Sequence, residues 1–150
     1  MKTTKLFRIF LGFSVLLISG CTAKSQIELS ESIKENLPAN TCGLFGEVTT
    51  TAHQPLANEV VWLAKVIYDD INDEGYFIID GGKSPSTISD SAGAFEFIGI
   101  DPADYVLIIG NLELNPYVLG QPDDPDKAKI FQCLESEVID AGEIIVNSND

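Results

Sequence analysis

Residues 59–68 read EVVWLAKVIY, a run dominated by β-branched and aromatic side chains. In an extended chain successive side chains point to opposite faces, so alternate residues share one face. The alternation predicts a strand that turns one set toward a core, namely Val60, Trp62, Ala64, Val66 and Tyr68. A similar run at 43–52 (GLFGEVTTTA) precedes it, separated by the polar turn 53–58 (HQPLAN). The two runs predict neighbouring β-strands.

Five more short apolar runs follow, with turn signals at 81–82, 90–93 and 101–102. They are 76–80 (YFIID), 94–100 (AFEFIGI), 105–109 (YVLII), 129–134 (KIFQCL) and 143–146 (EIIV). No ten-residue helical period occurs among them, so residues 41–150 predict an all-β domain, an antiparallel β-sandwich of about seven strands. Phe95 and Phe97 are expected in its core, with Glu96 facing solvent. Residues 111–129, with three prolines, predict a long exposed loop.

The chain has 150 residues, of which 45% are hydrophobic. It contains 9 Lys+Arg and 23 Asp+Glu, so its net charge is −14. This length suits one folded domain, and the apolar content is too high for a disordered chain. Nucleic-acid binding depends on Lys and Arg that neutralise phosphates, and this charge argues against it. We expect no nucleic-acid partner.

Residues 1–20 have the pattern of an export signal. Lys2, Lys5 and Arg8 precede an apolar run at 9–18, which is shorter than the roughly 20 residues of a membrane-spanning helix. Residues 17–21 (LISGC) then resemble the lipobox of bacterial lipoproteins. The resemblance implies cleavage before Cys21 and lipidation of that cysteine. It also implies a domain outside the cytoplasm, anchored by lipid to the cell membrane or outer membrane. An ordinary signal peptide that happens to end at a cysteine is the alternative.

Residues 21–40 are expected to form the lipidated N-terminus and a tether. Leu29, Ile33 and Leu37 have a four-residue spacing, and Ser32 with Glu35 has the pattern of a capping box. A short helix that stops before Pro38 is therefore predicted. A spacer is favoured over a helix that docks on a partner, because isolated short helices are marginal in water.

Cys42 and Cys133 remain once Cys21 is assigned to the lipid. An even pair of cysteines in an exported domain predicts a disulfide. Two separate buried thiols are the alternative, since the sequence does not show that the two α-carbons lie within bridging distance. The chain has no Cys/His spacing suited to a zinc site.

Four motifs between residues 43 and 109 resemble the carboxypeptidase regulatory-like domains, a transthyretin-like branch of the Ig-like sandwiches. The matching segments are 46–48 (GEV), 55–60 (PLANEV), 90–97 (DSAGAFEF) and 100–107 (IDPADYVL). Ala103 departs from the glycine common in the family, so the backbone there must avoid a positive φ or Asp104 must adopt it. The resemblance implies the Ig-like fold and, for many members, a non-catalytic module attached to other proteins.

Catalytic relatives of this fold need residues that the sequence lacks. Intradiol dioxygenases bind iron through two His and two Tyr, whereas His53 is the one histidine here. Transthyretin-like hydrolases use several His and a Tyr-Arg-Gly-Ser end, and this chain has no Arg after Arg8. Isopeptide-forming adhesin domains need a Lys on the first strand, and 43–52 has none. His53 lies in a polar turn with no acid at a useful spacing, so we predict that the protein is not an enzyme.

Calcium is the one cofactor that the sequence leaves open. Asp69, Asp70, Asn72, Asp73 and Glu74 precede Gly75 and resemble the first half of an EF-hand loop. Gly81 stands where the bidentate Glu belongs, so a complete EF-hand is not expected. A looser oxygen cage in this loop, or at Asp123, Asp124 and Asp126, is the alternative to simple solvated acidic loops, which we favour.

These observations predict a lipid-anchored, exported protein whose sandwich is a non-catalytic interaction or structural module at the cell envelope. The expected partners are the membrane, through the lipid, and another envelope or surface protein or a glycan. A calcium- or glycan-binding surface module is the first alternative. An enzyme with a pair of catalytic carboxylates is the less favoured one.

Overall fold

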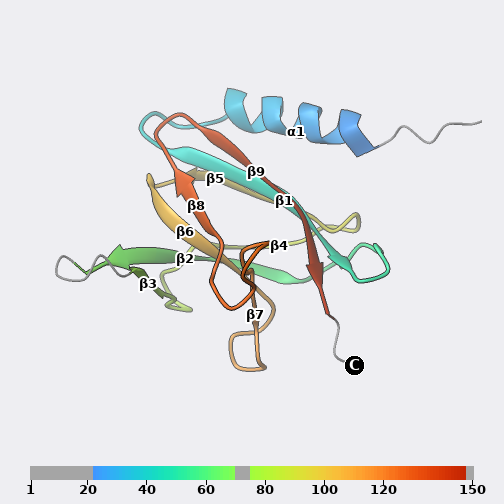
Figure 1. Ribbon diagram of the computed structural model, residues 1–150. Coiled ribbons are helices and arrows are strands. Elements are labelled where there is room, and N and C mark those ends of the chain that lie inside the picture. Colours follow the sequence, from blue (N-terminus) through green and yellow to red (C-terminus); the bar gives the residue numbers. More distant parts are fainter. Residues whose placement is uncertain (1–21, 70–74, 148–150) are drawn as a thin grey trace, which may run out of the picture.

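The computed structural model describes residues 22–69 and 75–147, which form a β-sandwich with one helix against it (Figure 1). The fold class predicted from the sequence is confirmed. Within the described residues the elements are α1 (Thr22–Glu35), β1 (Cys42–Thr50), β2 (Val60–Tyr68), β3 (Gly75–Ile78), β4 (Ser86–Ile88), β5 (Ala94–Ile100), β6 (Ala103–Ile109), β7 (Tyr117–Val118), β8 (Ile130–Cys133) and β9 (Val138–Val146). No helix in these two ranges is both long and apolar enough to cross a bilayer.

The strands form two sheets. The first has the order β5-β1-β9, and the second has the order β3-β2-β6-β7, with β4 also pairing β2 and β8 also pairing β6. All seven predicted strands are present, and β4 and β7 are additional short ones. The sandwich departs from a purely antiparallel pattern in one pair, because β1 and β9 run parallel. The chain reaches β9 by leaving the second sheet after β8, and a parallel pair requires such a crossover rather than a hairpin.

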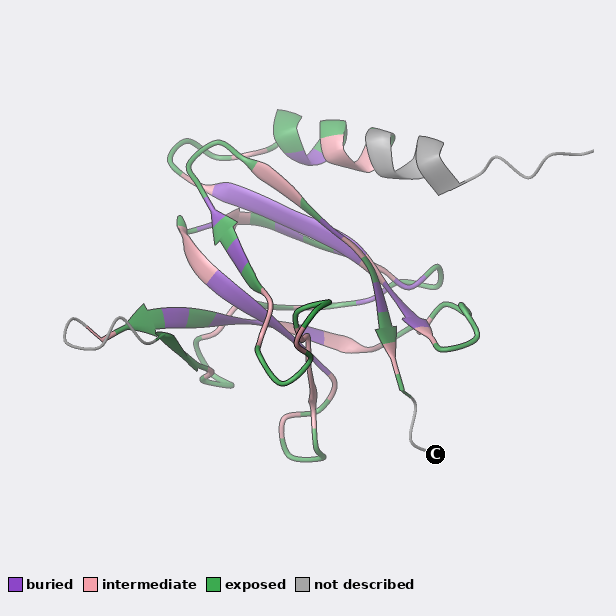
Figure 2. Cartoon of the chain, viewed as in Figure 1, coloured by how far each residue is buried: buried purple, intermediate pink, exposed green. Residues whose placement is uncertain are grey.

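The core lies between the two sheets, where the buried residues of Figure 2 concentrate. Phe95 and Phe97 are both buried, with ring centroids 6.2 Å apart in an edge-to-face arrangement, and Glu96 between them is exposed. The prediction for these three residues is confirmed. Leu44, Val48, Leu63, Leu107 and Ile144 complete the centre of the core.

The core face predicted for β2 is wrong. Val61 and Leu63 face the interior between the sheets, not the alternate set that includes Trp62. Ala64 and Val66 are buried on the opposite, outer face, Val60 and Trp62 are partly buried, and Tyr68 is exposed. Both alternating sets of this strand are largely apolar, so periodicity alone does not identify which one meets the other sheet.

The turn at 90–93 forms as its sequence predicts. One carboxylate oxygen of Asp90 accepts hydrogen bonds from the backbone N–H groups of Ala92 (2.8 Å) and Ala94 (2.9 Å). Gly93 has φ +77°, and a Cβ there would lie 2.4 Å from the carbonyl oxygen of Val48. Glycine is therefore required at this position by both conformation and space.

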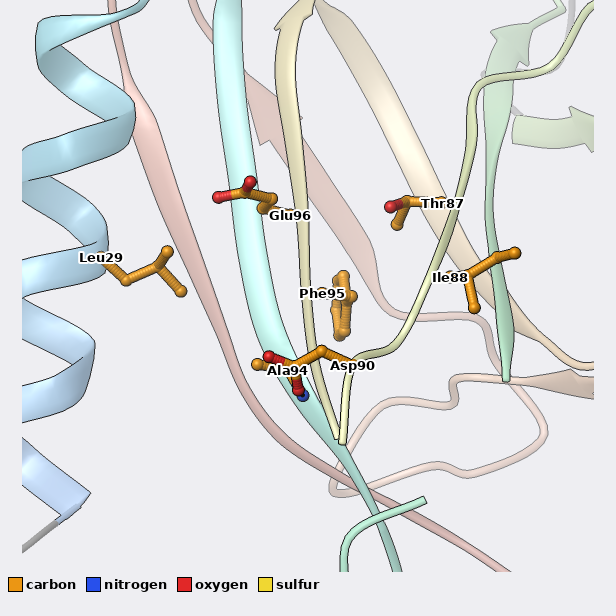
Figure 3. A pocket seen from close by; sticks show the side chains of 7 residues that line it. All are labelled: Leu29, Thr87, Ile88, Asp90, Ala94, Phe95 and Glu96. Carbon is orange, nitrogen blue, oxygen red and sulfur yellow. The ribbon is translucent and has the colours of Figure 1, made fainter. Parts of the chain in front are cut away.

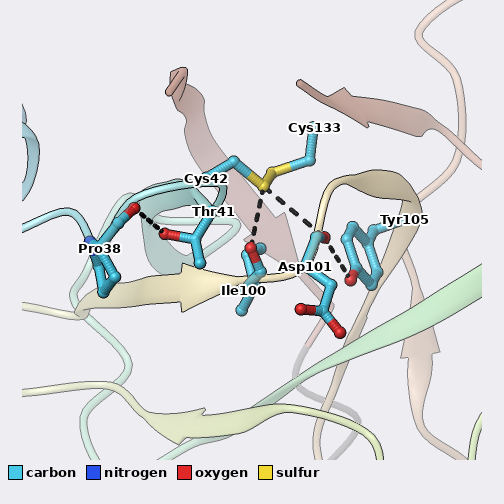
Figure 4. Close-up of a disulfide and its surroundings, with 7 residues drawn as sticks. All are labelled: Pro38, Thr41, Cys42, Ile100, Asp101, Tyr105 and Cys133. Carbon is cyan, nitrogen blue, oxygen red and sulfur yellow. Dashed lines mark hydrogen bonds between the residues drawn. A yellow bond between two sulfur atoms is a disulfide. The ribbon is translucent and has the colours of Figure 1, made fainter. Parts of the chain in front are cut away.

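The corner before β6 explains how the chain tolerates Ala103. Neither Ala103 nor Asp104 has a positive φ, whereas Asn58, in the segment 55–60, does, at 63°. The hydroxyl of Tyr105 donates a hydrogen bond to the backbone oxygen of Asp101 at 2.8 Å and fixes the corner (Figure 4). Burial, with the nearby Asp101 charge, raises the pKa of Tyr105, so this hydroxyl remains a donor.

Cys42 and Cys133 form the predicted disulfide, with α-carbons 6.0 Å apart (Figure 4). Both cysteines are fully buried in the core. The bond joins β1 of the first sheet to β8 of the second. It therefore fixes the two layers of the sandwich to each other covalently.

Helix α1 covers the outer face of the first sheet (Figure 1). It is longer than the predicted one, since Ser32 lies inside it rather than at its start, and it ends before Pro38 as expected. Ile33 is completely buried, and a Cβ on Gly43 would lie 2.7 Å from its Cγ2 atom. Glycine at 43 thus lets the helix approach β1, so its last turns pack on the domain instead of forming a free spacer.

Residues 111–129 are not simply an exposed loop. β7 pairs with β6, and the chain then folds back on itself, because Lys129 N donates to Leu119 O (2.8 Å) and Gln121 N donates to Lys127 O (2.7 Å). We name residues 119–129 the return hairpin. Ala128 in it packs on the outer face of the second sheet, against the buried cluster Ala64, Val66, Val106 and Ile108.

The disulfide closes a loop across a sequence separation of 91 residues. In the chain-entropy model, loops of this length stabilise a domain by about 4 to 5 kcal/mol. We therefore expect Cys42→Ala/Cys133→Ala to lower the free energy of unfolding by about 3 to 5 kcal/mol in urea titrations without reductant. Reductant during unfolding should weaken the parent protein and leave the double variant unchanged. Equal midpoints for the parent with and without reductant would contradict the assigned role.

Candidate binding site

The β2–β3 hairpin extends beyond the rest of the sandwich (Figure 1). Its two strands carry exposed apolar side chains. Those with more than a third of their surface exposed are Ile67, Tyr68, Tyr76, Phe77 and Ile78. Scattered exposed apolar residues are normal, but a contiguous group on one element marks a candidate interaction surface.

The strand register divides these side chains between the two faces of the hairpin. Val66 pairs with Phe77, and Tyr68 pairs with Gly75. Directly paired residues lie on the same face, so Tyr68 and Phe77 share the outer face with Val66. Tyr76, paired with Ile67, belongs to the other face of the strands.

Tyr68 is held in a defined position at both ends of its side chain. Its ring lies over Gly75, where a Cβ would be 3.2 Å from the ring atom Cε1. Its hydroxyl donates a hydrogen bond to Oδ2 of Asp104 at 2.5 Å. Tyr68 as a whole residue is nevertheless 47% exposed. Tyr68 is therefore a fixed aromatic surface open to solvent.

A groove of about 410 Å³ lies between the β2–β3 hairpin and the return hairpin. We name it the aromatic groove, and it is lined by Val66, Tyr68, Gly75, Tyr76, Phe77, Val106, Gln121, Lys127, Ala128 and Ile130. Its strand residues are apolar, and its polar groups come from the return hairpin. A mostly apolar concave surface with a few polar groups is typical of a small-ligand site.

His53 does have an acidic partner, contrary to the prediction. Nδ1 of His53 lies 2.8 Å from Oε1 of Glu143, which is 90 residues away in sequence. Thr49 donates its hydroxyl hydrogen to the same carboxylate oxygen at 2.7 Å. These hydrogen bonds, the His53 bond first, hold the pKa of Glu143 below its ordinary value.

The three side chains do not have the order of a catalytic triad. In a triad the histidine accepts a proton from the nucleophile and is itself oriented by the acid. Here both the Thr49 hydroxyl and the His53 ring contact Glu143, so the hydroxyl is bonded to the acid and not to the imidazole. The cluster instead ties the 50–54 turn to β9.

A smaller cavity of about 250 Å³ lies between α1 and the adjacent edges of β4 and β5 (Figure 3). Leu29 approaches it from the helix, and Thr87 and Ile88 lie on the far side. Asp90 lines it too, but its carboxylate already accepts two backbone hydrogen bonds in the 90–93 turn. The other polar groups of its lining are the Thr87 hydroxyl and the carboxylate of the exposed Glu96.

The predicted metal and lipid residues fall mostly outside the described part of the chain. Cys21, Asp70, Asn72, Asp73 and Glu74 are in the ranges that the structure does not describe, and Asp69 lies at their border. Within 22–69 and 75–147, no three His, Cys, Asp or Glu side chains are grouped so that they could hold a metal ion. Asp123, Asp124 and Asp126, which lie in the described part of the chain, do not form such a group.

The alternation of residues 59–68 predicts Tyr68 in the core and so does not reveal the aromatic groove. Two signals point to the groove once the register is known. The apolar pattern of 66–68 and 76–78 occupies both faces of a hairpin, and a glycine stands opposite the tyrosine. In a strand that is buried on one face only, apolar residues would alternate with polar ones.

Protonation of Glu143 should destabilise the folded protein. Its pKa is lowered in the folded state, so its contribution is complete above 4.5, the ordinary value, and is lost as the pH falls through the lowered pKa. We expect stability to fall more steeply below about pH 5 in the parent than in Glu143→Gln, by on the order of half a kcal/mol. Urea midpoints between pH 7 and 3 measure this, with Glu113→Gln as the control. Parallel curves for parent and Glu143→Gln would contradict it.

No protein family and no curated protein matches the sequence. Among solved structures, the chain is similar to the major pilin subunit BcpA of Bacillus cereus, at 14% identity and a TM-score of 0.44, over 73% of this chain and 30% of the pilin. A hydroxyquinol 1,2-dioxygenase of Pseudomonas putida is similar at 13% identity and a TM-score of 0.41, over 73% of this chain and 57% of the dioxygenase. A Pseudomonas aeruginosa protein to which carbohydrate binding has been attributed is similar at 11% identity and a TM-score of 0.41, over 78% of this chain and 95% of that protein. At these values the similarities assign neither an activity nor a ligand to this chain.

Proposed function

We propose that this protein is an exported, lipid-anchored binding module without catalytic activity, and that the aromatic groove is its ligand site. The observation that carries the proposal is the fixed, solvent-exposed ring of Tyr68 beside the apolar floor of the groove. Exposing such a surface costs favourable burial, so its presence in a well-packed domain favours a binding role.

The side chains of the described region favour binding over catalysis. His53, the one histidine of the chain, is bonded to Glu143 in a cluster without a triad's geometry. The aromatic groove contains no histidine or cysteine and takes its one ionisable amine from Lys127, an exposed residue paired with Asp124. Such a groove can hold a ligand but presents no activated nucleophile.

Two observations support export and anchoring. The Cys42–Cys133 disulfide fits an oxidising compartment outside the cytoplasm. Helix α1, which begins directly after Cys21, covers the first sheet, whereas the aromatic groove lies on the outer face of the second. Helix α1 therefore leaves the groove uncovered, as a binding module anchored through the segment before this helix requires.

The lipid anchor is tested at Cys21. Two or three acyl chains anchor a protein almost permanently, so the full chain should enter the detergent phase of a Triton X-114 separation. Cys21→Ser should move it to the aqueous phase, and Cys42→Ala should not. Mass spectrometry of the N-terminal peptide should find a diacylglycerol on Cys21. Detergent partitioning that persists in Cys21→Ser would contradict the anchor.

The groove is tested by binding to envelopes isolated from the native host. The non-lipidated Cys21→Ser chain should co-sediment with them, and adding Tyr68→Ala/Phe77→Ala should weaken this at least about tenfold, as loss of buried aromatic anchors does. Leu114→Ala is the matched control, since Leu114 is 75% exposed and lies outside the groove. Equal binding by the groove variant and the control would refute the assignment.

A further inference from the structure

We infer that the cleft between β9 and the return hairpin takes a zwitterionic ligand, namely a short peptide with a free ammonium and a free carboxylate group. This cleft shares only Gln121 with the aromatic groove, so it is a second site and does not depend on the ligand of that groove. Its volume is about 470 Å³, within the range of small-molecule sites. Two fixed and opposite charges beside an apolar surface point to this ligand class.

Glu143 supplies the negative charge on the β9 wall of the cleft. Thr49 and His53 both contact its Oε1 atom, at 2.7 Å and 2.8 Å, whereas Oε2 accepts no hydrogen bond from the described residues. The same contacts, that of His53 first, lower the pKa of Glu143, so the group is ionised at neutral pH. The side chain is 39% exposed. One oxygen of a fixed carboxylate is therefore left for a cationic group of a ligand.

Lys129, the last residue of the return hairpin, supplies the positive charge on the other wall. Its backbone N–H donates to Leu119 O at 2.8 Å, and its Nζ atom lies 4.7 Å from the centroid of the Phe131 ring. The chain has 23 Asp and Glu residues, yet within 22–69 and 75–147 none of them, Glu143 included, forms an ion pair with Lys129. An ammonium group beside an aromatic ring keeps its hydrogen-bond donors for a carboxylate.

The two charges together select against ligands that carry only one. Lys129 repels a cation, whereas Glu143 and the net charge of −14 repel an anion. An uncharged ligand would cover both charged groups without giving either a partner, which costs free energy. A ligand with one ammonium and one carboxylate group matches both walls.

The rest of the cleft favours a peptide over other zwitterions. β9 is an edge strand, since β1 is its one strand partner in the described part of the chain. The free backbone edge of such a strand can pair with the amide groups of an extended peptide, which a phospholipid headgroup lacks. Apolar residues that can accommodate peptide side chains also line the cleft, namely Tyr117, Leu119, Pro122, Pro125, Ala141 and Ile145.

The test titrates the full Cys21→Ser chain, labelled with ¹⁵N, with di-, tri- and tetra-alanine that have free termini. At least one of these peptides should shift the amide signals of residues 117–121 and 141–145. Acetylation of its N-terminus or amidation of its C-terminus should each raise the Kd at least about threefold, because a partly exposed ion pair is lost. Glycerophosphoethanolamine, a zwitterionic phospholipid headgroup, should not shift these signals.

Two variants assign the two ends of the peptide. Lys129→Met should abolish the preference for a free carboxylate and keep the preference for a free ammonium group, and Glu143→Gln should do the reverse. Lys127→Met and Glu113→Gln change one residue of each charge outside the cleft and should alter neither preference. The amide spectrum of each variant shows directly whether it is folded.

The assignment is wrong if no alanine peptide shifts the cleft signals, if blocked peptides bind as tightly as the free one, or if both preferences persist in both variants. Shifts with glycerophosphoethanolamine but with no peptide would equally overturn it, in favour of a lipid headgroup. Envelope binding through Tyr68 and Phe77 is measured separately, so failure of this second site and failure of the aromatic groove are distinguishable.

Discussion

The Cys42–Cys133 disulfide is the constraint on which the rest of the structure depends. It fixes β8 of the second sheet to β1 of the first, inside the core. β8 begins at Ile130, directly after the return hairpin, so the position of that hairpin follows from the position of β8. The return hairpin is one wall of the aromatic groove. A covalent bond in the core thus determines the shape of a surface site.

The two outer faces of the sandwich are covered to different extents. Helix α1 covers the first sheet, where Gly43 allows Ile33 to become completely buried. The second sheet is covered only in part, by the return hairpin, and the β2–β3 hairpin extends past that cover. Each sheet must bury one face, and its second face is free for other uses. In this protein the outer face of the second sheet is the one left partly uncovered, and the aromatic groove lies on it.

The sequence predicted the local features well and the long-range ones poorly. The 90–93 turn and the buried pair Phe95 and Phe97 follow from neighbouring residues, and the structure confirms them. The core face predicted for β2 is wrong because both alternating sets of this strand are largely apolar. The parallel pairing of β9 and the bond between His53 and Glu143 depend on residues far apart in sequence, which no local period reveals. The groove was missed for the same reason, since its two walls come from separate hairpins.

A tyrosine at 68 reconciles the demands of folding and binding. An exposed aliphatic side chain would offer apolar surface to any partner, including another copy of the chain. Tyr68 instead has a hydroxyl, and its bond to Asp104 satisfies that polar end and restricts the ring to one orientation. Tyr and Trp bring a large contact area with only two side-chain torsions to fix. The side chain at this exposed position is therefore held by a polar contact of its own, rather than by burial in the core.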